Sequence, residues 1–481
     1  MTRYEPVIGL EVHAQLLTKT KLFCGCSVVY GAAPNTQLCP SCLGLPGAVP
    51  RLNRRAVELA VRVSLALGCE LNRDTVFSRK HYFYPDLASN YQISQYEPPV
   101  VGKGELSIEV DGSERRIGIT RAHLEEDAAK NIHGAGGGLY TVVDYNRGGQ
   151  PLLEIVSEPD LRSAEEAEVY LRKLREILIF AGVNDGNLEE GSFRCDANVS
   201  IRPVGQEAFG TRVELKNINS FRFVRRAIDF EIARQEAVLS SGGKLVQETR
   251  TWNENRGQTI SMREKESAQD YRYFEAPELP RIVIDDALID KARAELPELP
   301  DAIRARFIED FGLTPYDAGV LTAHPAIARY FDAVASGLKA DAKLGKRVAN
   351  FIQGEVLRDT ELAGLEAKFP VTEEALIELL KLVEAKTINL NLAKQVFHEM
   401  ASSGKSAAAI VEEKGLGGGV DEAALEAEVL KIIEKNPAQL EQYRGGKAAV
   451  FGFFVGQVMR ATRGQADPQL VQALLKKHLD G

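Results

Sequence analysis

The spacing of apolar residues changes once along this chain, and the change limits the folds open to it. Up to about residue 290, short runs such as VIGLEVHAQL and TVVDY alternate apolar with polar residues and are separated by Gly-rich turns. This pattern is typical of antiparallel β-strands. From Ile303 onward the apolar residues recur at helical spacing and strand signals disappear. The sequence therefore predicts an α+β body followed by an all-α part.

Two further features predict where these parts divide. The stretch 275–301 is punctuated by Pro and acidic residues, and residues 402–420 contain the Gly- and Ser-rich runs SSGKS and KGLGGGV. A chain of 481 residues is also too long for one compact core. We predict a multidomain α+β fold with an α/β domain over residues 1–293 that holds an antiparallel sheet, a helical domain over 294–405 and a helical tail over 406–481.

Helices are also expected inside the α/β domain, where helical spacing meets capping residues. A Gly just after the last turn and a Ser-x-x-Glu capping box are the signals used. Three helices are expected. The first covers residues 53–67 and stops at Gly68, the second runs from Ser163 to about Phe180, and the third runs from near Ser220 to Gly242.

Charge and hydropathy exclude some classes of protein. No stretch approaches the roughly 18 apolar residues of a membrane span, and the start MTRYEPVIGLEVHAQL lacks the apolar core of a secretion signal. The cytoplasm is therefore the expected location. A net charge of −9 argues against a protein that coats nucleic acid non-specifically. From residue 441 onward, six basic residues outnumber three acidic ones, and this net charge of +3 indicates a polyanion contact in the tail.

Two segments place His beside acidic residues. In a strand, VIGLEVHAQL puts Glu11 and His13 on one face, which suits a divalent metal or acid–base chemistry, although a solvated edge strand has the same pattern. In RAHLEEDAAK, a strand would place His123, Glu125 and Asp127 together and turn Glu126 away, whereas a helix would pair His123 with Glu126 or Asp127. A solvated acidic turn is the alternative for this second segment.

A third acidic residue, Glu154, lies inside the apolar run PLLEIV. An unpaired carboxylate there would be costly, so a partner is expected. The partner is either a metal ion or a cation such as Arg147, and in the second case the pair is a structural salt bridge.

Four of the six cysteines lie close together, as Cys24-x-Cys26 and Cys39-Pro-Ser-Cys42. Two close pairs about a dozen residues apart fit a tetrahedral zinc knuckle over residues 24–42. Four thiolates leave no open position, so such a zinc ion would be structural. Four buried thiols are the alternative.

The run FSRKHYFYPDLASNYQISQY interleaves basic residues with aromatic ones. Such a surface can stack on a base or hold a tRNA acceptor end, but an aromatic core strand with a charged face looks the same. No P-loop, dinucleotide fingerprint or kinase signature is present. The residues alone therefore indicate a metal-dependent acid–base enzyme or a zinc-bearing RNA-binding protein.

Eight longer stretches add a resemblance that covers essentially the whole chain. They are VIGLEVHAQL, RKHYFYPDLASNYQISQY, RAHLEEDAAK, VDYNRGGQPLLEIVSEPD, EEGSFRCDANVSIRP, ELKNINSFRFV, MREKESAQDYRYF and GFFVGQVMRATRGQADPQLV. In these the chain resembles the B subunits of the GatCAB tRNA-dependent amidotransferases. The resemblance implies a cradle-shaped α/β domain that carries the active site, a helical domain and a tail resembling YqeY.

The resemblance also implies an activity, that of an ATP-dependent carbon–nitrogen ligase with glutamine as the amide donor. ATP phosphorylates the side-chain carboxylate of Glu on tRNA(Gln) or of Asp on tRNA(Asn). Ammonia from the glutaminase of an A subunit then displaces phosphate, within a heterotrimer completed by a C subunit. The implied cofactors are ATP and Mg²⁺, and Zn²⁺ in those members of the family that carry the four cysteines.

Site residues follow from the same resemblance. Catalytic and Mg²⁺-binding roles are implied for Glu11, His13, Glu125 and Glu154, with Glu126 as the alternate to Glu125. The implied contacts with the charged CCA end are Lys80, Tyr82 and Tyr84, and those with phosphates are Asn146 and Arg147. The implied tRNA contacts of the tail are Arg444, Lys447, Arg460 and Arg463. The implied zinc ligands are Cys24, Cys26, Cys39 and Cys42.

Two rival functions make different predictions. A non-catalytic tRNA scaffold with a structural zinc predicts no ATP hydrolysis and tolerance of changes at Glu11 or Glu154. A metal-dependent hydrolase of a small substrate predicts activity without tRNA or partner subunits. Neither accounts for the resemblance along the full chain.

Overall fold

The computed structural model describes residues 3–134, 138–264, 271–416, 422–462, 466 and 468–480. The chain separates into two compact units, Met1–Ala302 and Ile303–Gly481. This boundary lies at the end of the Pro-punctuated stretch 275–301. The finer division into three domains stays a prediction.

The first unit is built on one large sheet in the strand order β13-β12-β11-β10-β1-β9-β6-β4-β3-β14, with β5 paired to β6. Its neighbours are antiparallel except β11 and β12, which are parallel. The central strands are β1 (Tyr4–Gln15), β6 (Ser113–Glu126), β9 (Pro151–Ser157) and β10 (Phe193–Pro203). The flanking strands are β3 (Ser78–His81), β4 (Tyr91–Ser94), β5 (Gly104–Val110), β11 (Val213–Ile218), β12 (Glu248–Asn253), β13 (Gln258–Glu264) and β14 (Phe274–Glu275).

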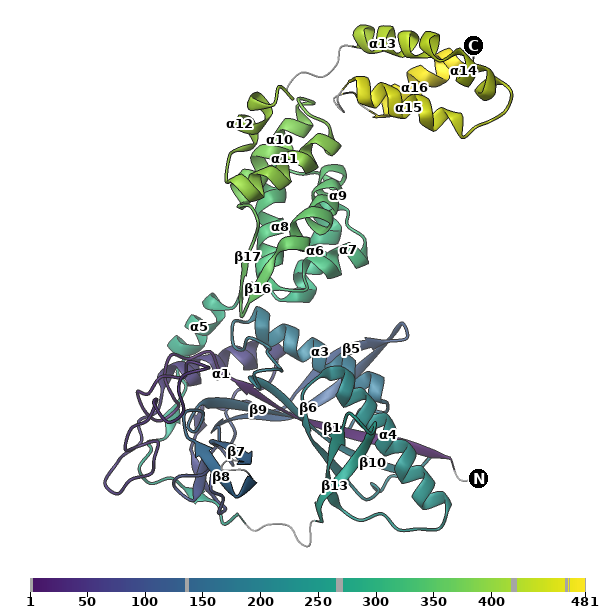
Figure 1. The fold of residues 1–481 in the computed structure, drawn as a ribbon. Helices are drawn as coiled ribbons and strands as arrows, with labels where there is room; N and C mark the ends of the chain where they lie inside the picture. Colours follow the sequence, from purple (N-terminus) through teal and green to yellow (C-terminus); the bar gives the residue numbers. More distant parts are fainter. Residues whose placement is uncertain are drawn as a thin grey trace. The chain divides into compact units, whose positions relative to one another are not determined.

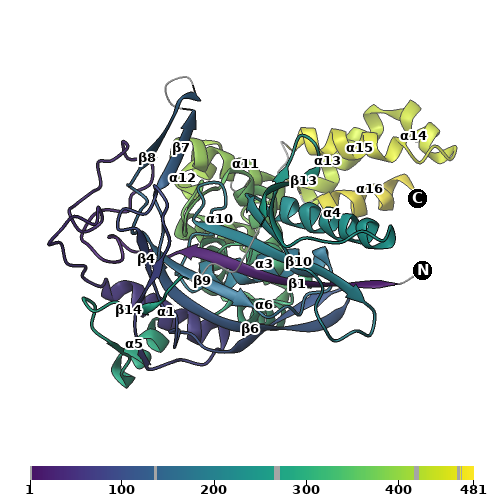
Figure 2. The same cartoon turned by 90° about the horizontal axis from the view of Figure 1, so that it is seen from below.

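One face of this sheet packs on helices, as Figures 1 and 2 show. Alternation along β1 buries Ile8, Leu10 and Val12 completely or nearly so in a core shared with α1 (Arg54–Leu67), α3 (Ala164–Phe180) and α4 (Phe221–Ser240). The odd-numbered residues of β1 therefore point to the other face. That face carries Glu11 and His13.

The predicted helices of this unit are confirmed, and local capping explains their ends. Asn53 accepts a hydrogen bond from the Arg55 amide at the start of α1, and Gly68 ends it with a φ of 63°. At α3, Ser163 Oγ accepts from the Glu166 amide at 3.1 Å. A left-handed backbone at the end of a helix suits glycine, and a hydroxyl satisfies an otherwise free amide at the start.

Three smaller pieces complete the first unit. Strand β2 (Asp74–Thr75) pairs with β15 (Ile282–Val283), and β7 (Lys130–Gly134) forms a hairpin with β8 (Tyr140–Asp144). Helix α5 (Asp286–Glu295) packs on α1 through the ion pair between Arg62 and Glu295.

In its described residues, the second unit is helical apart from one hairpin. Its helices are α6 (Pro300–Phe311), which begins just before the boundary, α7 (Pro315–Leu321), α8 (Pro325–Gly337), α9 (Ala342–Phe351), α10 (Glu373–Glu384), α11 (Leu390–Ser403) and α12 (Ala407–Glu413). A π-helical turn (Ile352–Val356) and a 3-10 turn (Leu357–Asp359) follow α9. The expectation of an all-α part is wrong at β16 (Glu361–Ala363) and β17 (Glu366–Lys368), because strands this short leave no readable alternation.

The last helices share a small core of their own. They are α13 (Glu422–Lys435), α14 (Pro437–Arg444), α15 (Val450–Ala461) and α16 (Pro468–Leu479), which bury Leu425, Phe454 and Leu475 among others. The large, mostly antiparallel sheet and the helical second unit together confirm the predicted multidomain α+β class. No helix among the described residues is long and apolar enough to cross a membrane.

Candidate functional site

The register of three central strands brings two imidazoles and two carboxylates together. His13 on β1 lies opposite Glu154 on β9, and Glu154 lies opposite His123 on β6. Glu125 follows His123 by two residues, so it shares that face of the sheet. These four side chains form the histidine–carboxylate cluster. Of the alternatives left open for RAHLEEDAAK, the strand is the one observed, and it extends to Glu126.

The contacts within the histidine–carboxylate cluster are close. His13 Nε2 lies 3.4 Å from a carboxylate oxygen of Glu154 and 3.8 Å from one of Glu125. His123 Nε2 lies 3.5 Å from Glu154 and 3.6 Å from Glu125. Only 3% of Glu125 and 4% of His123 is exposed, so these side chains are held in a largely dry setting.

The electrostatics of the cluster favour the ionised form of Glu154. Burial acts to raise the pKa of Glu154, but His123, His13 and Lys80 outweigh it and hold that pKa below its usual range. Burial likewise acts to lower the pKa of His13, while Glu154 and Glu125 raise the pKa to about 9. A carboxylate that is held in its ionised form, as Glu154 is, suits a cation site.

Glu11 lies on the same face of the sheet as the histidine–carboxylate cluster, but it belongs to a neighbouring set of acidic residues. Its carboxylate accepts a 2.8 Å hydrogen bond from Asn198 and lies near Asp196 and Glu214. Burial and the charge of Glu154 raise the pKa of Glu11. The Lys216 ammonium bridges this group, with a hydrogen bond to Asp196 and a 3.2 Å contact with Glu214.

The structure thus brings three of the four predicted catalytic residues into one cluster and places Glu11 beside it. The sequence reasoning missed the residues around Glu11. The sequence pattern that could have revealed them is strand alternation. In RCDANVS, Asp196 and Asn198 alternate with apolar residues, and in VELKN, Glu214 and Lys216 are two residues apart.

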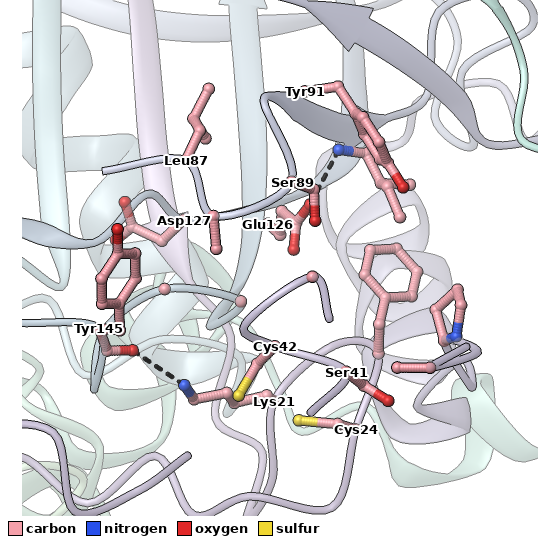
Figure 3. A pocket seen from close by; sticks show the side chains of 18 of the residues that line it. Lys21, Cys24, Ser41, Cys42, Leu87, Ser89, Tyr91, Glu126, Asp127 and Tyr145 are labelled. Carbon is pink, nitrogen blue, oxygen red and sulfur yellow. Dashed lines mark hydrogen bonds between the residues drawn. The ribbon is translucent and has the colours of Figure 1, made fainter. Parts of the chain in front are cut away.

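Glu126 points away from the histidine–carboxylate cluster, as strand alternation predicts. Its carboxylate accepts a 2.9 Å hydrogen bond from the Ile93 amide and lines a separate cavity of about 200 Å³. Figure 3 shows this cavity, with Lys21 and Cys42 across it from Glu126. Burial raises the pKa of Glu126 to about 7.

The predicted aromatic and basic run contributes a lysine set between rings. The Lys80 ammonium lies 4.9 Å from the ring centre of Tyr271 and 5.7 Å from that of Tyr82. Burial acts to lower the pKa of Lys80, but Glu125, Tyr273 and Glu154 raise it, so Lys80 faces the carboxylates. Tyr84 is half exposed, with its ring 6.4 Å from that of Tyr82. Sequence reasoning missed Tyr271, although MREKESAQDYRYF contains it.

Asn146 and Arg147 already have partners inside the protein. Asn146 donates to the Ala33 carbonyl at 2.7 Å and so holds the segment between the two cysteine pairs. Arg147 donates to the carbonyls of Ala128 and Ala129 at 2.9 Å and lies 3.6 Å from Asp127. Arg147 is therefore not the partner of Glu154. The predicted phosphate contacts of Asn146 and Arg147 stay predictions.

The four clustered cysteines meet as the spacing predicts. Their sulfur atoms all lie within 4.8 Å of one another. A tetrahedron with metal–sulfur bonds of about 2.3 Å has edges of roughly 3.8 Å, so the thiols present fit a zinc ion with little movement. The hydrogen bond between Cys24 and Cys42 lowers the pKa of Cys42 and raises that of Cys24, so Cys42 is the thiol of this pair that ionises first.

Purified protein is expected to contain about one zinc per chain, and the paired change Cys39→Ser with Cys42→Ser is expected to remove it. Because a structural zinc contributes folding energy directly, the double variant should also unfold at a lower temperature. Elemental analysis and a thermal scan measure both effects. Cys69→Ser, at an isolated cysteine, is the control and should keep the metal. Full zinc content in the double variant would contradict this site.

The predicted tRNA contacts of the tail lie on its surface where they are described. Arg444, Lys447 and Arg460 are exposed, and Arg463 lies outside the described residues. Glycines four apart on a helix, such as Gly452 and Gly456 on α15, often allow close packing of a neighbouring helix, but a Cβ at either would meet nothing within 4 Å. The glycines instead leave an open surface beside Arg460.

Two parts of the chain match known domain families. Residues 6–290 match the GatB/GatE catalytic domain, which contains the sheet and the histidine–carboxylate cluster. Residues 329–479 match the GatB domain, which contains the last helices.

Whole proteins from several bacteria are similar over their full length. A relative from Anaeromyxobacter sp. (strain Fw109-5) is 53% identical over 99% of both chains. Relatives from Geobacter sulfurreducens and Halorhodospira halophila are each 54% identical, over at least 99% of this chain and 100% of their own. All three are named as the B subunit of an aspartyl/glutamyl-tRNA(Asn/Gln) amidotransferase. The chain belongs to this family of amidotransferase B subunits.

Proposed function

We propose that this protein uses ATP to activate the side-chain carboxylate of misacylated Glu-tRNA(Gln), Asp-tRNA(Asn) or both. A carboxylate oxygen attacks the γ-phosphorus of ATP, and ADP leaves. Ammonia then attacks the acyl carbon, and phosphate leaves with the original carboxylate oxygen. The products are Gln-tRNA(Gln) and Asn-tRNA(Asn). The observation that carries the proposal is the buried histidine–carboxylate cluster at the centre of a domain that matches the family along its whole length.

The donor set of the cluster fits a Mg²⁺ ion. Glu125 and Glu154 would supply carboxylate oxygens, and His13 would supply a nitrogen once the metal displaces its proton, with all three ligand atoms within 4.8 Å of one another. Glu11 lies beside them and completes the predicted set. Mg²⁺ held by these residues would neutralise negative charge during phosphoryl transfer. His13 also positions the acyl group or ammonia, because its imidazole lies between the two carboxylates.

The lysine between aromatic rings suits the acyl end of the substrate. Lys80 faces Glu125 and Glu154, and Tyr82 and Tyr271 pack beside its ammonium. A cation there attracts a carboxylate, and half-exposed Tyr84 offers a ring on which the CCA end can stack. Lys80, Tyr82 and Tyr84 are therefore proposed to hold the charged CCA end near the reaction centre.

The reaction requires ammonia from elsewhere. The sequence carries no amidase signature, so we propose an assembly with a glutaminase A subunit and a C subunit, acting in the cytoplasm where charged tRNA is found. In the tail, exposed Arg444, Lys447 and Arg460 are proposed to bind the tRNA backbone, with Arg463 as the fourth contact predicted from the sequence. Each predicted domain would then have its own role: the α/β domain would carry catalysis, the helical domain would connect it to the tail, and the tail would bind tRNA.

An oxygen-transfer experiment tests the proposal with the purified A–B–C assembly. The substrate is Glu-tRNA(Gln) or Asp-tRNA(Asn) with ¹⁸O in the side-chain carboxylate, and the product analysed is inorganic phosphate. One ¹⁸O per phosphate is expected, because phosphate leaves with an oxygen from the carboxylate. ATP hydrolysis should also require charged tRNA.

Two results would count against the proposal. Phosphate without ¹⁸O would mean that water, not the carboxylate, attacks ATP. Amidation without any ATP turnover would make this protein a tRNA scaffold. Uncharged tRNA is the matched control and should give neither labelled phosphate nor faster hydrolysis.

A further inference from the structure

His123 is the member of the histidine–carboxylate cluster to which the proposed reaction gives no role. Only 5% of its side chain is exposed, against 18% for the side chain of His13. The Nδ1 atom of His123 is buried and, among the described residues, has no hydrogen-bond partner. Leaving a buried polar atom unpaired is costly, so the other ring nitrogen, Nε2, is expected to serve a purpose.

The Nε2 atom of His123 faces two carboxylates. It lies 3.6 Å from Oε2 of Glu125 and 3.5 Å from Oε2 of Glu154. Ser94 Oγ donates a 3.4 Å hydrogen bond to the same Oε2 of Glu125. His13 Nε2, in contrast, lies 3.8 Å from Oε1 of Glu125. The two oxygens of Glu125 are therefore divided, with Oε2 toward His123 and Ser94 and Oε1 toward His13.

His123 is not part of the converging ligand set. The ligand atoms of His13, Glu125 and Glu154 lie within 4.8 Å of one another, and among the described residues His123 joins no such set. His13 is also the more exposed of the two imidazoles, so the open side of the cluster is the side of His13. His123 thus contacts two of the candidate ligands without being one of them.

The sheet fixes this arrangement. His123 lies opposite Glu154 across the pair of β6 and β9, and Ser94 on β4 lies opposite Glu125 on β6. Side chains that lie opposite each other on neighbouring strands point to the same face. Hydrogen-bonded strands therefore hold His123 and Ser94 at a set distance from the carboxylates.

We propose that His123 is a positioning residue of the metal site, which together with Ser94 holds Oε2 of Glu125 so that Oε1 faces the cation beside His13. The inference rests on the proposed Mg²⁺-dependent function and adds a residue that acts through two of the ligands. A carboxylate that is already held by one oxygen has less freedom to lose when the other oxygen binds a cation. Removing a partner of this kind typically costs about 10- to 100-fold in metal affinity.

Binding of Mn²⁺ to the assembled A–B–C complex, without nucleotide and at one fixed pH, tests the proposal. The electron paramagnetic resonance signal of free Mn²⁺ measures how much metal stays unbound. His123→Asn places its amide nitrogen near the position of the unpaired Nδ1, and His123→Gln places it near the position of Nε2. His123→Asn is therefore expected to raise the Kd for Mn²⁺ about 10- to 100-fold, while His123→Gln stays close to the wild type. His133→Asn changes an exposed imidazole outside the cluster and is the control.

Mg²⁺-dependent kinetics give a second readout. His123→Asn should raise the Mg²⁺ concentration for half-maximal ATP-dependent amidation by a similar factor, with kcat at saturating Mg²⁺ and KM for charged tRNA nearly unchanged. Ser94→Ala removes the other contact with Oε2 of Glu125 and should raise the Kd for Mn²⁺ by a smaller factor. Thermal unfolding checks that each variant is folded, and Ser94→Ala carries the test if His123→Asn is not.

The outcomes separate this inference from the function on which it rests. An unchanged Kd for Mn²⁺ in whichever of His123→Asn and Ser94→Ala is folded would overturn the proposal. Equal losses of affinity in His123→Asn and His123→Gln would also overturn it, because the shape of the ring would then matter and not Nε2. If the wild-type complex neither binds Mn²⁺ nor hydrolyses ATP, the proposed function fails as well.

Discussion

Glu154→Gln is expected to lower ATP-dependent amidation by the assembled complex at least about a hundredfold, while glutamine hydrolysis by the A subunit continues. The change keeps the shape of the side chain but removes the charge that His13 and His123 face at 3.4 Å and 3.5 Å. Removing one group that stabilises a transition state electrostatically commonly costs a factor of about 10² to 10³. Single-turnover formation of ADP from charged tRNA measures the effect.

The control lies on the same sheet. Glu109→Gln changes an exposed carboxylate on β5 and should leave the rate unchanged. Glu11→Ala should also lower the rate, because Glu11 lies next to the cluster and is hydrogen-bonded to Asn198. Near-normal activation in Glu154→Gln would show that the metal and the γ-phosphate lie elsewhere.

Glu231→Ala is expected to lower the free energy of unfolding of the first unit by about 3–5 kcal/mol. Glu231 on α4 is fully buried and accepts hydrogen bonds from Arg234 at 2.7 Å, Gln235 at 2.9 Å and Thr259 at 3.1 Å. Its carboxylate also lies 3.5 Å from Arg250. Removing one partner of a buried ion pair leaves the other charge desolvated without compensation.

A natural probe lies beside this network. The only tryptophan of the chain, Trp252, packs against Phe230 of α4, so its fluorescence during urea unfolding reports this part of the sheet. Glu236→Ala, at an exposed position on the same helix, is the control and should change the free energy by less than about 0.5 kcal/mol. If Glu231→Ala also changed the free energy of unfolding by no more than this, the buried network would contribute little to stability.

Strand alternation was sufficient to predict which side chains share a face. It placed Glu11 with His13, and Glu125 rather than Glu126 with His123, because successive residues of a strand point in opposite directions. The zinc-type spacing of the cysteines was readable for a similar reason, since the four thiols are close in the sequence.

Contacts across the sheet could not be predicted in this way. Whether Glu11 faces Glu154 or Asp196 depends on which strands flank β1 and in what register, and the strand order β10-β1-β9-β6 is set by packing over the whole unit. Lys80 meets Tyr271 from a distant part of the chain for the same reason. Arg147 looked available to Glu154 from spacing alone, but the turn that carries it directs it to Ala128 and Ala129.

The position of β1 between two antiparallel partners also bears on how genes for this domain can change length. Adding or deleting one residue between Gly9 and His13 would turn every following side chain to the opposite face, so that imidazole and carboxylate would enter the apolar core and Val12 would leave it. A codon gained or lost here is therefore far more damaging than most substitutions. Heritable insertions and deletions are expected to accumulate in the connecting loops, and the central strand to keep its length.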